Sequence, residues 1–482
     1  MKNDISKYLK SSPLCDFDSE TIRHKADAIV AGAKSQREKS NRILEFWKNE
    51  IVFTYDNWDV PASAALSKGS GMCAAKNAGS VAMHRYAGIP ARLKVLGFDA
   101  ESKLWEYAAR WDPWLAGKTK TLGKRRDHVI HEIYLDGRWE QHDVTRDNTL
   151  EAGMKIYGMP SEADFVPEDL KMADFDRWAV ARQKKAHIPP SERAEFHRRI
   201  NNIVRIIRET GMLVLDKESG ASQLARKAVA TLKEAIERDD SQDIAGFLRF
   251  ITEAGGKLTE ARPNMAPLTN LMATVFYQVQ AKARTEKDLP KLRQASTAIA
   301  DKTIKDSKKA GRQAAKNGAD LIANGNKIMA CSFSSTLNEL FRLARKQGKE
   351  FEVVVSRSRV GDKDYGEMTT KALRRYQIPS KIIPDNAVRH NLRTLGVQKV
   401  LVGADSILAD GSLVNGWPTD WLALMARDSN IPLYVICETA KFNPRLTAEK
   451  VELEAGFDLI PPELITGIVT EEGIIKPGDV GQ

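Results

Sequence analysis

Cysteine is scarce in this chain of 482 residues, and the four cysteines lie far apart. No pair has the CxxC spacing or the Cys/His spacing that is typical of a structural zinc site. The scarcity also argues against a disulfide framework, so we expect a reducing compartment. We expect no metal centre and no cofactor. The four are Cys15, Cys73, Cys331 and Cys437.

Long apolar runs are absent as well. No stretch approaches the roughly 20 consecutive apolar residues that a membrane-spanning helix needs. The first residues, MKNDISKYLKSSPLCDF, carry charges but no apolar core, so we expect no secretory signal. These absences predict a cytoplasmic protein with no membrane partner. The length of the chain predicts two or three domains.

Nucleic-acid-binding motifs are missing, although the chain is basic. The formal net charge is +10 and the isoelectric point is about 9.2. The lysines and arginines are spread along the chain, with local groups at Lys118–Arg126 and Lys302–Lys316. We therefore interpret the charge as a solvated surface that attracts phosphorylated or acidic ligands, and we do not expect a nucleic-acid partner.

The first part of the chain divides into a helical, a mixed and a second helical segment. A helical lead-in is expected over Asp18–Asn49, and a segment rich in tryptophan, glycine and proline follows to about residue 175. The second helical segment runs from Pro190 through Ala283. Loops are expected to interrupt it at residues 217–222 and 261–264.

From about Asn326, short apolar runs alternate with amphipathic stretches of helical length. This alternation predicts βαβ units and a parallel sheet that is buried on both faces. The expected strands are Lys327–Ala330, Phe351–Val355, Lys381–Ile383, Lys399–Val402 and Pro432–Ile436. We predict three domains, with bounds 1–190, 191–305 and 306–482.

Cys73 is predicted to lie in the first turn of a helix. Ser70 and Gly71 can cap the start of this helix, and Gly88 with Pro90 ends it. The unpaired N–H groups and the positive dipole end of a first turn favour a thiolate over a thiol. The alternative is a small apolar side chain packed under a loop.

A β-hairpin with an Asp136-Gly137 turn is predicted downstream. In this register Asp143 shares a face with His128, at about 7 Å between backbones, whereas His131 lies on the opposite face. A one-residue bulge would reverse that choice. The expected opposite pairs are Leu135 with Arg138, Tyr134 with Trp139, Glu132 with Gln141, and Ile130 with Asp143.

These positions predict a cysteine acyl-transfer site. His128 would take the thiol proton of Cys73, and Asp143 would orient the imidazole and stabilise its charged form. The thiolate would attack a carbonyl, and water or an amine would resolve the thioester. The alternative is a surface hairpin with an incidental His–Asp pair. Asn57 and Trp58 lie upstream and are candidates for an oxyanion hole or an acceptor wall, or for ordinary packing.

Three blocks in this region resemble the transglutaminase-like superfamily over about residues 40–150. The resemblance implies a papain-like fold, with Cys73 as nucleophile, His128 as base and Asp143 as orienting carboxylate. It does not fix the reaction, because the superfamily includes cross-linking enzymes, proteases, amidases and inactive binding modules. The blocks are Gly71-Met-Cys73, Ala87-Gly-Ile-Pro-Ala-Arg92, and His128 with Glu132, Trp139 and Asp143.

Polar groups follow two of the expected strands in the second half. Cys331–Thr336 opens a helix after a strand, where hydroxyls and backbone donors form a natural phosphate cradle. Gly403–Ser406 follows another strand and places Asp405 at the carboxyl edge of the sheet, where ligands of α/β folds bind. For each segment, helix capping is the alternative role.

From about Gly220 to its end, the chain resembles a family that unites regulatory subunits of the exchange factor of translation initiation factor 2 with sugar-phosphate isomerases. These isomerases act on ribose 1,5-bisphosphate and methylthioribose 1-phosphate. Motifs that carry the resemblance include Leu258-Thr-Glu-Ala-Arg-Pro263, Val402-Gly-Ala-Asp-Ser-Ile407 and Glu438-Thr-Ala-Lys-Phe442. The resemblance implies a helical subdomain, a Rossmann-like subdomain and association into dimers or larger rings. The phosphosugar- or nucleotide-binding residues that it implies are Gly220, Ala221, Arg262, Ser332, Ser334, Ser335, Arg359, Asp405, Asn415 and Lys441.

Several positions depart from the isomerase pattern. Asp405 matches the aspartate that the isomerases use at the sugar, but Ser332 stands at the place of their cysteine and Cys331 lies one residue early. A serine hydroxyl is a poor acid compared with a thiol. The lysine expected after Asn415 is Gly416. A glycine of the pattern is Pro418, and the arginine expected before Gly220 is Ser219.

The sequence thus predicts a multidomain α+β and α/β protein with a papain-like core, a helical subdomain and a Rossmann-like parallel-sheet domain. The preferred hypothesis is an acyl transferase or an amide or ester hydrolase, coupled to a domain that binds a phosphorylated sugar or nucleotide. One alternative is an aldose–ketose isomerase with an accessory transglutaminase-like domain. Another is a non-enzymatic, translation- or RNA-associated regulator. We expect a small-molecule substrate and a homo-oligomer.

Overall fold

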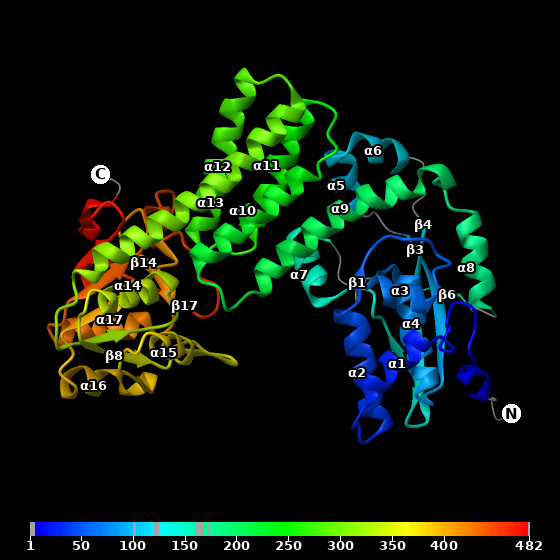
Figure 1. The fold of residues 1–482 in the computed structure, drawn as a ribbon, viewed down its shortest axis with the longest axis horizontal. Coiled ribbons are helices and arrows are strands. Elements are labelled where there is room, and N and C mark those ends of the chain that lie inside the picture. Colours follow the sequence, from blue (N-terminus) through cyan, green and yellow to red (C-terminus); the bar gives the residue numbers. More distant parts are fainter. Residues whose placement is uncertain (1–4, 100–102, 120–124, 160–167, 171–173, 481–482) are drawn as a thin grey trace. The chain divides into compact units, whose positions relative to one another are not determined.

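The computed structural model is a multidomain protein of mixed α/β structure (Figure 1). It describes residues 5–99, 103–119, 125–159, 168–170 and 174–480. Unit 1 comprises Met1–Leu215 with Arg238–Phe250, and unit 2 comprises Asp216–Glu237 with Ile251–Gln482. The domain boundaries expected after residues 190 and 305 stay predictions.

Unit 1 begins with the helical lead-in that the sequence predicts. A short 3-10 helix, Ile5–Leu9, precedes two α-helices, α1 (Glu20–Val30) and α2 (Gln36–Asn49). The two are separated where Gly32 takes a left-handed backbone conformation, with φ +71°, which glycine adopts without a steric penalty. Ser35 then caps α2, because its hydroxyl accepts a hydrogen bond from the amide of Glu38.

Helix α4 (Cys73–Tyr86) is the central helix of unit 1 and places Cys73 in its first turn, as expected. The expected cap is wrong. Met72 is the N-cap and makes no side-chain cap bond, because Ser70–Gly71 forms strand β2, which pairs with β1 (Val52–Phe53). A further helix, α3 (Ala62–Lys68), precedes β2. Every residue of α4 from Cys73 to His84 is buried, and four of them are polar. Buried polar side chains need internal partners.

A four-stranded antiparallel sheet lies against α4, in the order β5-β4-β3-β6 (Figure 1). The hairpin of β4 and β5 has the predicted register from Leu135–Arg138 outward to His131–His142. Asp136 and Gly137 both have positive φ, as a type I′ turn requires. The last expected pair, Ile130 with Asp143, falls one residue beyond the observed ladder. The strands are β3 (Ala91–Asp99), β4 (Arg125–Leu135), β5 (Arg138–His142) and β6 (Glu168–Leu170).

Helices α7 (Asn148–Ile156) and α9 (Pro190–Leu215) cross at two glycines. A Cβ on Gly153 would lie 1.8 Å from the carbonyl oxygen of Ile207, and one on Gly211 would lie 1.7 Å from that of Thr149. The backbones can approach this closely only because neither residue has a side chain. The remaining described helices of unit 1 are α5 (Lys103–Trp111), α6 (Pro113–Thr119) and α8 (Phe175–Lys184).

Unit 2 starts with the rest of the second helical segment. The expected breaks at 217–222 and 261–264 separate its helices, and a further break at residues 238–243 was not predicted. Helix α11 runs from unit 1 into unit 2. The helices are α10 (Ala221–Glu237), α11 (Ile244–Glu260), α12 (Ala266–Thr285) and α13 (Leu289–Ala319).

The sheet of unit 2 confirms the five predicted strands and their parallel arrangement. Its order is β11-β8-β7-β12-β15-β18-β19, and only the edge strand β19 is antiparallel. Val400 and Val402 pack into one apolar cluster and Leu401 into another, so both faces are buried. The strands are β7 (Asn326–Ala330), β8 (Phe351–Ser356), β11 (Ser380–Ile383), β12 (Lys399–Val402), β15 (Leu433–Ile436), β18 (Gly467–Val469) and β19 (Ile474–Ile475).

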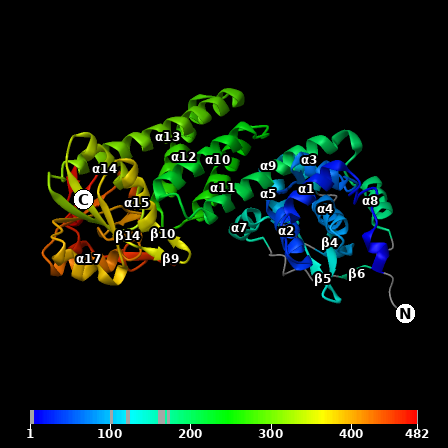
Figure 2. The same cartoon turned by 60° about the horizontal axis from the view of Figure 1, so that its bottom comes forward.

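Smaller elements complete unit 2. A hairpin of β9 (Arg359–Val360) and β10 (Lys363–Asp364) precedes α15 (Figure 2). A second sheet has the order β16-β13-β14-β17. Its strands are β13 (Ser406–Leu408), β14 (Leu413–Gly416), β16 (Phe442–Asn443) and β17 (Phe457–Ile460). The remaining helices are α14 (Ser335–Lys346), α15 (Tyr365–Arg375), α16 (Val388–Thr394) and α17 (Thr419–Asp428). The finer descriptions, papain-like for unit 1 and Rossmann-like for unit 2, stay predictions.

Two candidate active sites

The first candidate site joins the three residues that the sequence singles out in unit 1. Nε2 of His128 lies 2.5 Å from Oδ2 of Asp143, and the imidazole also hydrogen-bonds Cys73. Because Asp143 occupies Nε2, Nδ1 is the ring nitrogen left to face the sulfur. Cys73 is 5% exposed, and the side chains of His128 and Asp143 are each 15% exposed. The group is sheltered but open to a small reagent.

The electrostatics favour charged forms of the imidazole and the carboxyl. Burial alone would lower the pKa of His128, but the charge and hydrogen bond of Asp143, with a smaller contribution from Cys73, raise it to about 10. Burial would raise the pKa of Asp143, but His128 and the hydrogen bonds of Thr145 hold it well below its usual range. A protonated imidazole therefore faces the sulfur at neutral pH, and such a partner stabilises a thiolate.

His131 takes no part in this group. It is fully buried on the opposite face of β4, where Nδ1 lies 2.6 Å from Oδ1 of Asn77 and Nε2 lies 3.0 Å from the hydroxyl of Ser80. Burial lowers the pKa of His131 well below its ordinary value, so the ring is neutral. His128 is thus the imidazole that the fold directs to the thiol.

The two upstream candidates, Asn57 and Trp58, are engaged by α8. The side-chain oxygen of Asn57 accepts a hydrogen bond of 2.8 Å from Gln183, and the backbone amide of Trp58 donates to the same glutamine. The Trp58 ring makes an edge-to-face contact with Trp178 and lies under the guanidinium of Arg182. These contacts match the packing alternative.

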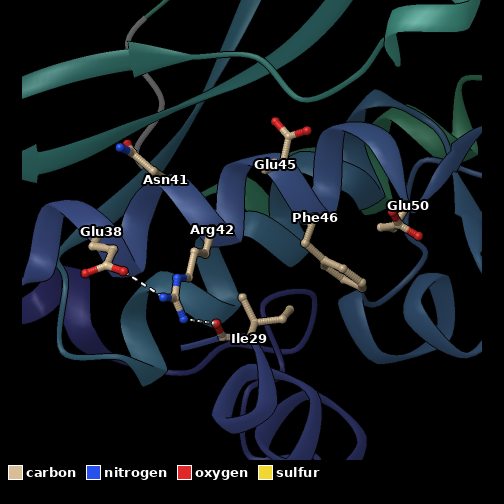
Figure 3. A pocket seen from close by; sticks show the side chains of 7 residues that line it. All are labelled: Ile29, Glu38, Asn41, Arg42, Glu45, Phe46 and Glu50. Carbon is tan, nitrogen blue, oxygen red and sulfur yellow. Dashed lines mark hydrogen bonds and ion pairs between the residues drawn. The ribbon is translucent and has the colours of Figure 1, made fainter. Parts of the chain in front are cut away.

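Two hollows lie along α2 near this site. The smaller, about 340 Å³, has Asp143 and His142 in its wall; its other lining residues are Asn41, Leu44, Glu45, Lys48 and Val144. The larger, about 540 Å³, shares Asn41 and Glu45 with it. Figure 3 shows Arg42 in the wall of the larger hollow, bonded to Glu38 and to the carbonyl of Ile29. None of the predicted site residues lines the larger hollow.

The second candidate site lies at the carboxyl edge of the parallel sheet in unit 2. Asp405 follows β12 and keeps partial solvent access, while the surrounding protein raises its pKa and the charges of Lys441 and Arg262 oppose that rise. Lys441 is buried and donates to the carbonyl of Ala404. Arg262 is also buried, 3.4 Å from Glu454. Two cations beside a carboxyl group make a setting suited to a phosphate-bearing ligand.

Ser332 has an unusual backbone conformation at the end of β7. Its φ is +62°, and it is held by a hydrogen bond from its amide to the hydroxyl of Ser358 and by one from the hydroxyl of Thr369 to its carbonyl. A Cβ on Gly416 would lie 2.8 Å from the hydroxyl oxygen of Ser332, so two of the residues that depart from the isomerase pattern lie close together.

Cys331 does not replace the missing cysteine. It is 1% exposed, and its sulfur lies 3.3 Å from the hydroxyl oxygen of Ser358 and 3.6 Å from that of Thr419. Burial raises its pKa, which favours the neutral thiol. Asn415 is buried beside it and donates to the hydroxyl of Thr419.

The residues of the predicted phosphate cradle lie around the start of α14, and phosphate binding there stays a prediction. Ser334 caps the helix, and its hydroxyl accepts from the amide of Leu337. A Cβ on Gly403 would lie 2.6 Å from that hydroxyl, so glycine is needed there. Gly220 faces Ser335, since a Cβ on it would be 3.9 Å from the hydroxyl oxygen.

The two remaining predicted residues differ in their surroundings. Ala221 is buried and is the first residue of α10. Arg359 lies exposed on β9, where its guanidinium donates to the carbonyl of Gly361.

Sequence patterns missed two groups beside Asp405. Tyr365, at the start of α15, is half-buried. Burial raises the pKa of its hydroxyl, the charge of Arg262 lowers that pKa, and the charge of Asp405 raises it. Glu454 pairs with Arg262 and has one side-chain oxygen buried without a hydrogen bond. Neither residue lies in a motif, so no local signal could have identified them.

Within the described part of the chain, no group of three or more His, Cys, Asp or Glu side chains has the arrangement of a metal site. Among the same residues, no helix combines the length and the apolar character required to cross a bilayer.

Comparison with known proteins finds a family match in each of two regions of the chain. Residues 23–144 match the model of the transglutaminase-like superfamily, and residues 217–456 match that of the initiation factor 2 subunit family. A ribose 1,5-bisphosphate isomerase of Pyrococcus furiosus is 30% identical over 57% of this chain and 92% of its own. A putative translation initiation factor eIF-2B subunit 2-like protein of the same organism is 32% identical over 57% of this chain and 96% of its own.

Solved structures agree for unit 2. The translation initiation factor eIF-2B of Pyrococcus horikoshii has a TM-score of 0.51 at 28% identity, covering 58% of this chain and 99% of its own. A chain of the tetrameric eIF2B-beta2-delta2 complex of Chaetomium thermophilum has a TM-score of 0.52 at 19% identity, covering 61% of this chain and 97% of its own, and shows likeness of fold alone. The chain belongs to the initiation factor 2 subunit family, which includes ribose 1,5-bisphosphate isomerases, and carries a transglutaminase-like domain ahead of it.

Proposed function

We propose that unit 2 binds a phosphorylated sugar and isomerises it between aldose and ketose, with Asp405 as the proton-carrying group. The observation that carries this proposal is the position of Asp405 at the carboxyl edge of the sheet, where burial raises its pKa and the charges of Lys441 and Arg262 oppose that rise. A carboxyl group whose pKa is raised is a better proton donor, and it can give a proton to a sugar oxygen and take one back at a later step. The cations would bind the phosphate groups. The similarity to ribose 1,5-bisphosphate isomerases supports this substrate class.

The departures from the isomerase pattern bear on the rate of this reaction. Ser332 offers a hydroxyl where the isomerases have a thiol, and a hydroxyl is a far weaker acid. Since Cys331 is buried and hydrogen-bonded elsewhere, it does not supply the missing proton donor. We therefore propose a slow isomerase, in which the ligand is bound by the same pocket but one acid is weakened.

The test is incubation of the full chain with ribose 1,5-bisphosphate, followed by measurement of ketose formation. Turnover should be lost in Asp405→Asn and retained in Asp428→Asn, a control on the exposed end of α17. It should also survive Cys73→Ala. Absence of ketose from the wild-type chain, or equal turnover in Asp405→Asn, would refute the proposal.

A second function is favoured by a separate observation, the 2.5 Å contact of His128 with Asp143 beside Cys73. We propose that Cys73 is the nucleophile of an acyl transfer or hydrolysis. The thiolate bonds to the carbonyl carbon of an amide or ester, and the amine or alcohol leaves with the proton of His128. Water or an amine then attacks the thioester, giving its proton to His128 and releasing the thiolate. Electrons and protons balance without a cofactor.

Alkylation by iodoacetamide tests the second function. Cys73, the most exposed of the four buried thiols at 5%, should react at neutral pH well ahead of Cys15, Cys331 and Cys437. His128→Ala should slow the reaction of Cys73, whereas His24→Ala, on the exposed face of α1, should leave it unchanged. Equal rates for the four thiols would remove the case for an activated cysteine. Self-association of the chain stays a prediction that sedimentation can test.

A further inference from the structure

Asn77 lies one helical turn after Cys73 and is fully buried. Its side-chain nitrogen lies 2.9 Å from the carbonyl oxygen of Cys73 and 2.9 Å from that of Val129. The same nitrogen lies 3.1 Å from the hydroxyl of Thr145 and 3.3 Å from Oδ1 of Asp143. Two amide hydrogens therefore serve four acceptors around the candidate site.

The orientation of this amide follows from its neighbours. The nitrogen faces two carbonyls and a carboxylate, none of which can donate a hydrogen bond. The side-chain oxygen faces Nδ1 of His131 at 2.6 Å and the backbone amide of Val144 at 3.4 Å. Turning the amide over would set oxygen against oxygen at the carboxylate of Asp143. The acceptor role of the oxygen also places the His131 proton on Nδ1.

We propose that Asn77 is a positioning residue that holds the carboxylate of Asp143 toward His128 and so keeps Cys73 reactive. This inference rests on the second proposed function, in which Cys73 is the nucleophile. Asn77 joins three segments at once: the start of α4 through the carbonyl of Cys73, β4 next to His128 through Val129, and the segment after β5 through Asp143.

The other supports of the carboxylate are local to it. Thr145 donates to Oδ1 of Asp143 from its amide at 2.8 Å and from its hydroxyl at 2.5 Å, but it lies only two residues away along the same segment. These bonds fix the carboxylate within its own loop. Asn77 is the group that ties that loop to the helix carrying the sulfur, so it sets the geometry between sulfur, imidazole and carboxylate.

His131 fixes the side chain of Asn77 by a hydrogen bond to its oxygen. Its Nδ1–H donates to the Asn77 oxygen, while its Nε2 accepts from the hydroxyl of Ser80 on the same helix as Asn77. The ring is neutral because burial lowers its pKa. A neutral ring with one donor and one acceptor nitrogen matches both partners, and this match fixes which end of the Asn77 amide faces His131.

The test is the pH profile of iodoacetamide labelling at Cys73 in the full chain, for wild type, Asn77→Ala and Asn77→Ser. The serine hydroxyl can still donate to the carbonyl of Cys73 four residues earlier, as serine does in helices, but is too short to reach Asp143. It therefore keeps the fold testable if the alanine variant fails to fold. Asn201→Ala is the matched control, since Asn201 makes two hydrogen bonds to the backbone of Tyr55 in the same unit.

In both Asn77 variants, iodoacetamide should label Cys73 about tenfold more slowly at pH 6. The midpoint of the pH profile of labelling should also move to higher pH, as expected when a support of a functional imidazole pair is removed. The Asn201 variant should keep the wild-type midpoint. A folded Asn77→Ser protein with an unchanged profile would overturn the inference and leave the second proposed function intact. Equal labelling of all four wild-type thiols would instead refute that function, and the inference with it.

Discussion

Mild acid should destabilise unit 1, because His84 is buried in its neutral form. The imidazole is fully buried on α4, with Nδ1 2.7 Å from the carbonyl of Ser80 and Nε2 3.0 Å from the hydroxyl of Ser40. Nδ1–H donates to the carbonyl, so Nε2 accepts from the hydroxyl. Both ring nitrogens of the neutral imidazole therefore have a partner, and burial of the ring disfavours a second proton.

The magnitude follows from the pKa of His84. Burial lowers it from 6.5 to about 4, and the hydrogen bonds to Ser80 and Ser40 offset only part of that effect. The unfolded chain takes up a proton near pH 6.5 and the folded chain only near pH 4. The stabilisation is therefore complete above pH 6.5 and is lost as the pH falls toward 4. Linkage gives a loss of about 2 kcal/mol between pH 7 and pH 5 from this ring alone.

Urea unfolding followed by tryptophan fluorescence measures this loss, because seven of the nine tryptophans lie in unit 1. His84→Gln should be less stable than wild type at pH 7, but it should lose about 2 kcal/mol less than wild type on acidification to pH 5. His24→Gln, at an exposed position, should follow the wild-type pH dependence. Equal pH dependence in wild type and His84→Gln would refute the reasoning.

Two further predictions concern packing and chemistry. Gly79→Ala should destabilise unit 1 by about 3 kcal/mol, since its Cβ would lie 2.1 Å from the ring of Trp47. Gly117→Ala in α6 should instead stabilise the protein by up to about 1 kcal/mol, since its Cβ would have nothing within 4 Å. Thermal unfolding of both variants checks these opposite signs. Ser332→Cys should raise ketose formation about tenfold or more by restoring a thiol at the sugar, and an unchanged rate would mean that residue 332 supplies no proton.

Local chemistry made much of this structure predictable. The Asp136-Gly137 turn sets the register of the hairpin, and that register places Asp143 on the face of His128. The apolar runs of the second half predict the parallel strands, because a sheet covered on both faces needs no polar alternation. In both cases the determining residues are neighbours in sequence, or repeat with a fixed period.

The polar interior of α4 could not be predicted in this way. Hydropathy does not show whether a polar side chain such as that of Asn77 or His84 has a buried partner. Those partners come from distant segments: His131 lies on β4 and Ser40 on α2. The capping error at Ser70 has the same origin, since pairing of β2 with β1 depends on a strand that is not adjacent in sequence.

The meeting of Gly153 with Gly211 has a practical consequence for dissecting the protein. A fragment that ends at residue 190 would lack α9, and α7 would lose its backbone packing against that helix. Extending it to Leu215 restores that contact but still omits Arg238–Phe250, which belongs to the same compact unit. An uninterrupted fragment that ends at Leu215 thus loses part of unit 1, and one that ends at Phe250 includes Asp216–Glu237 of unit 2. The chemistry of unit 1 is therefore best measured in the intact chain.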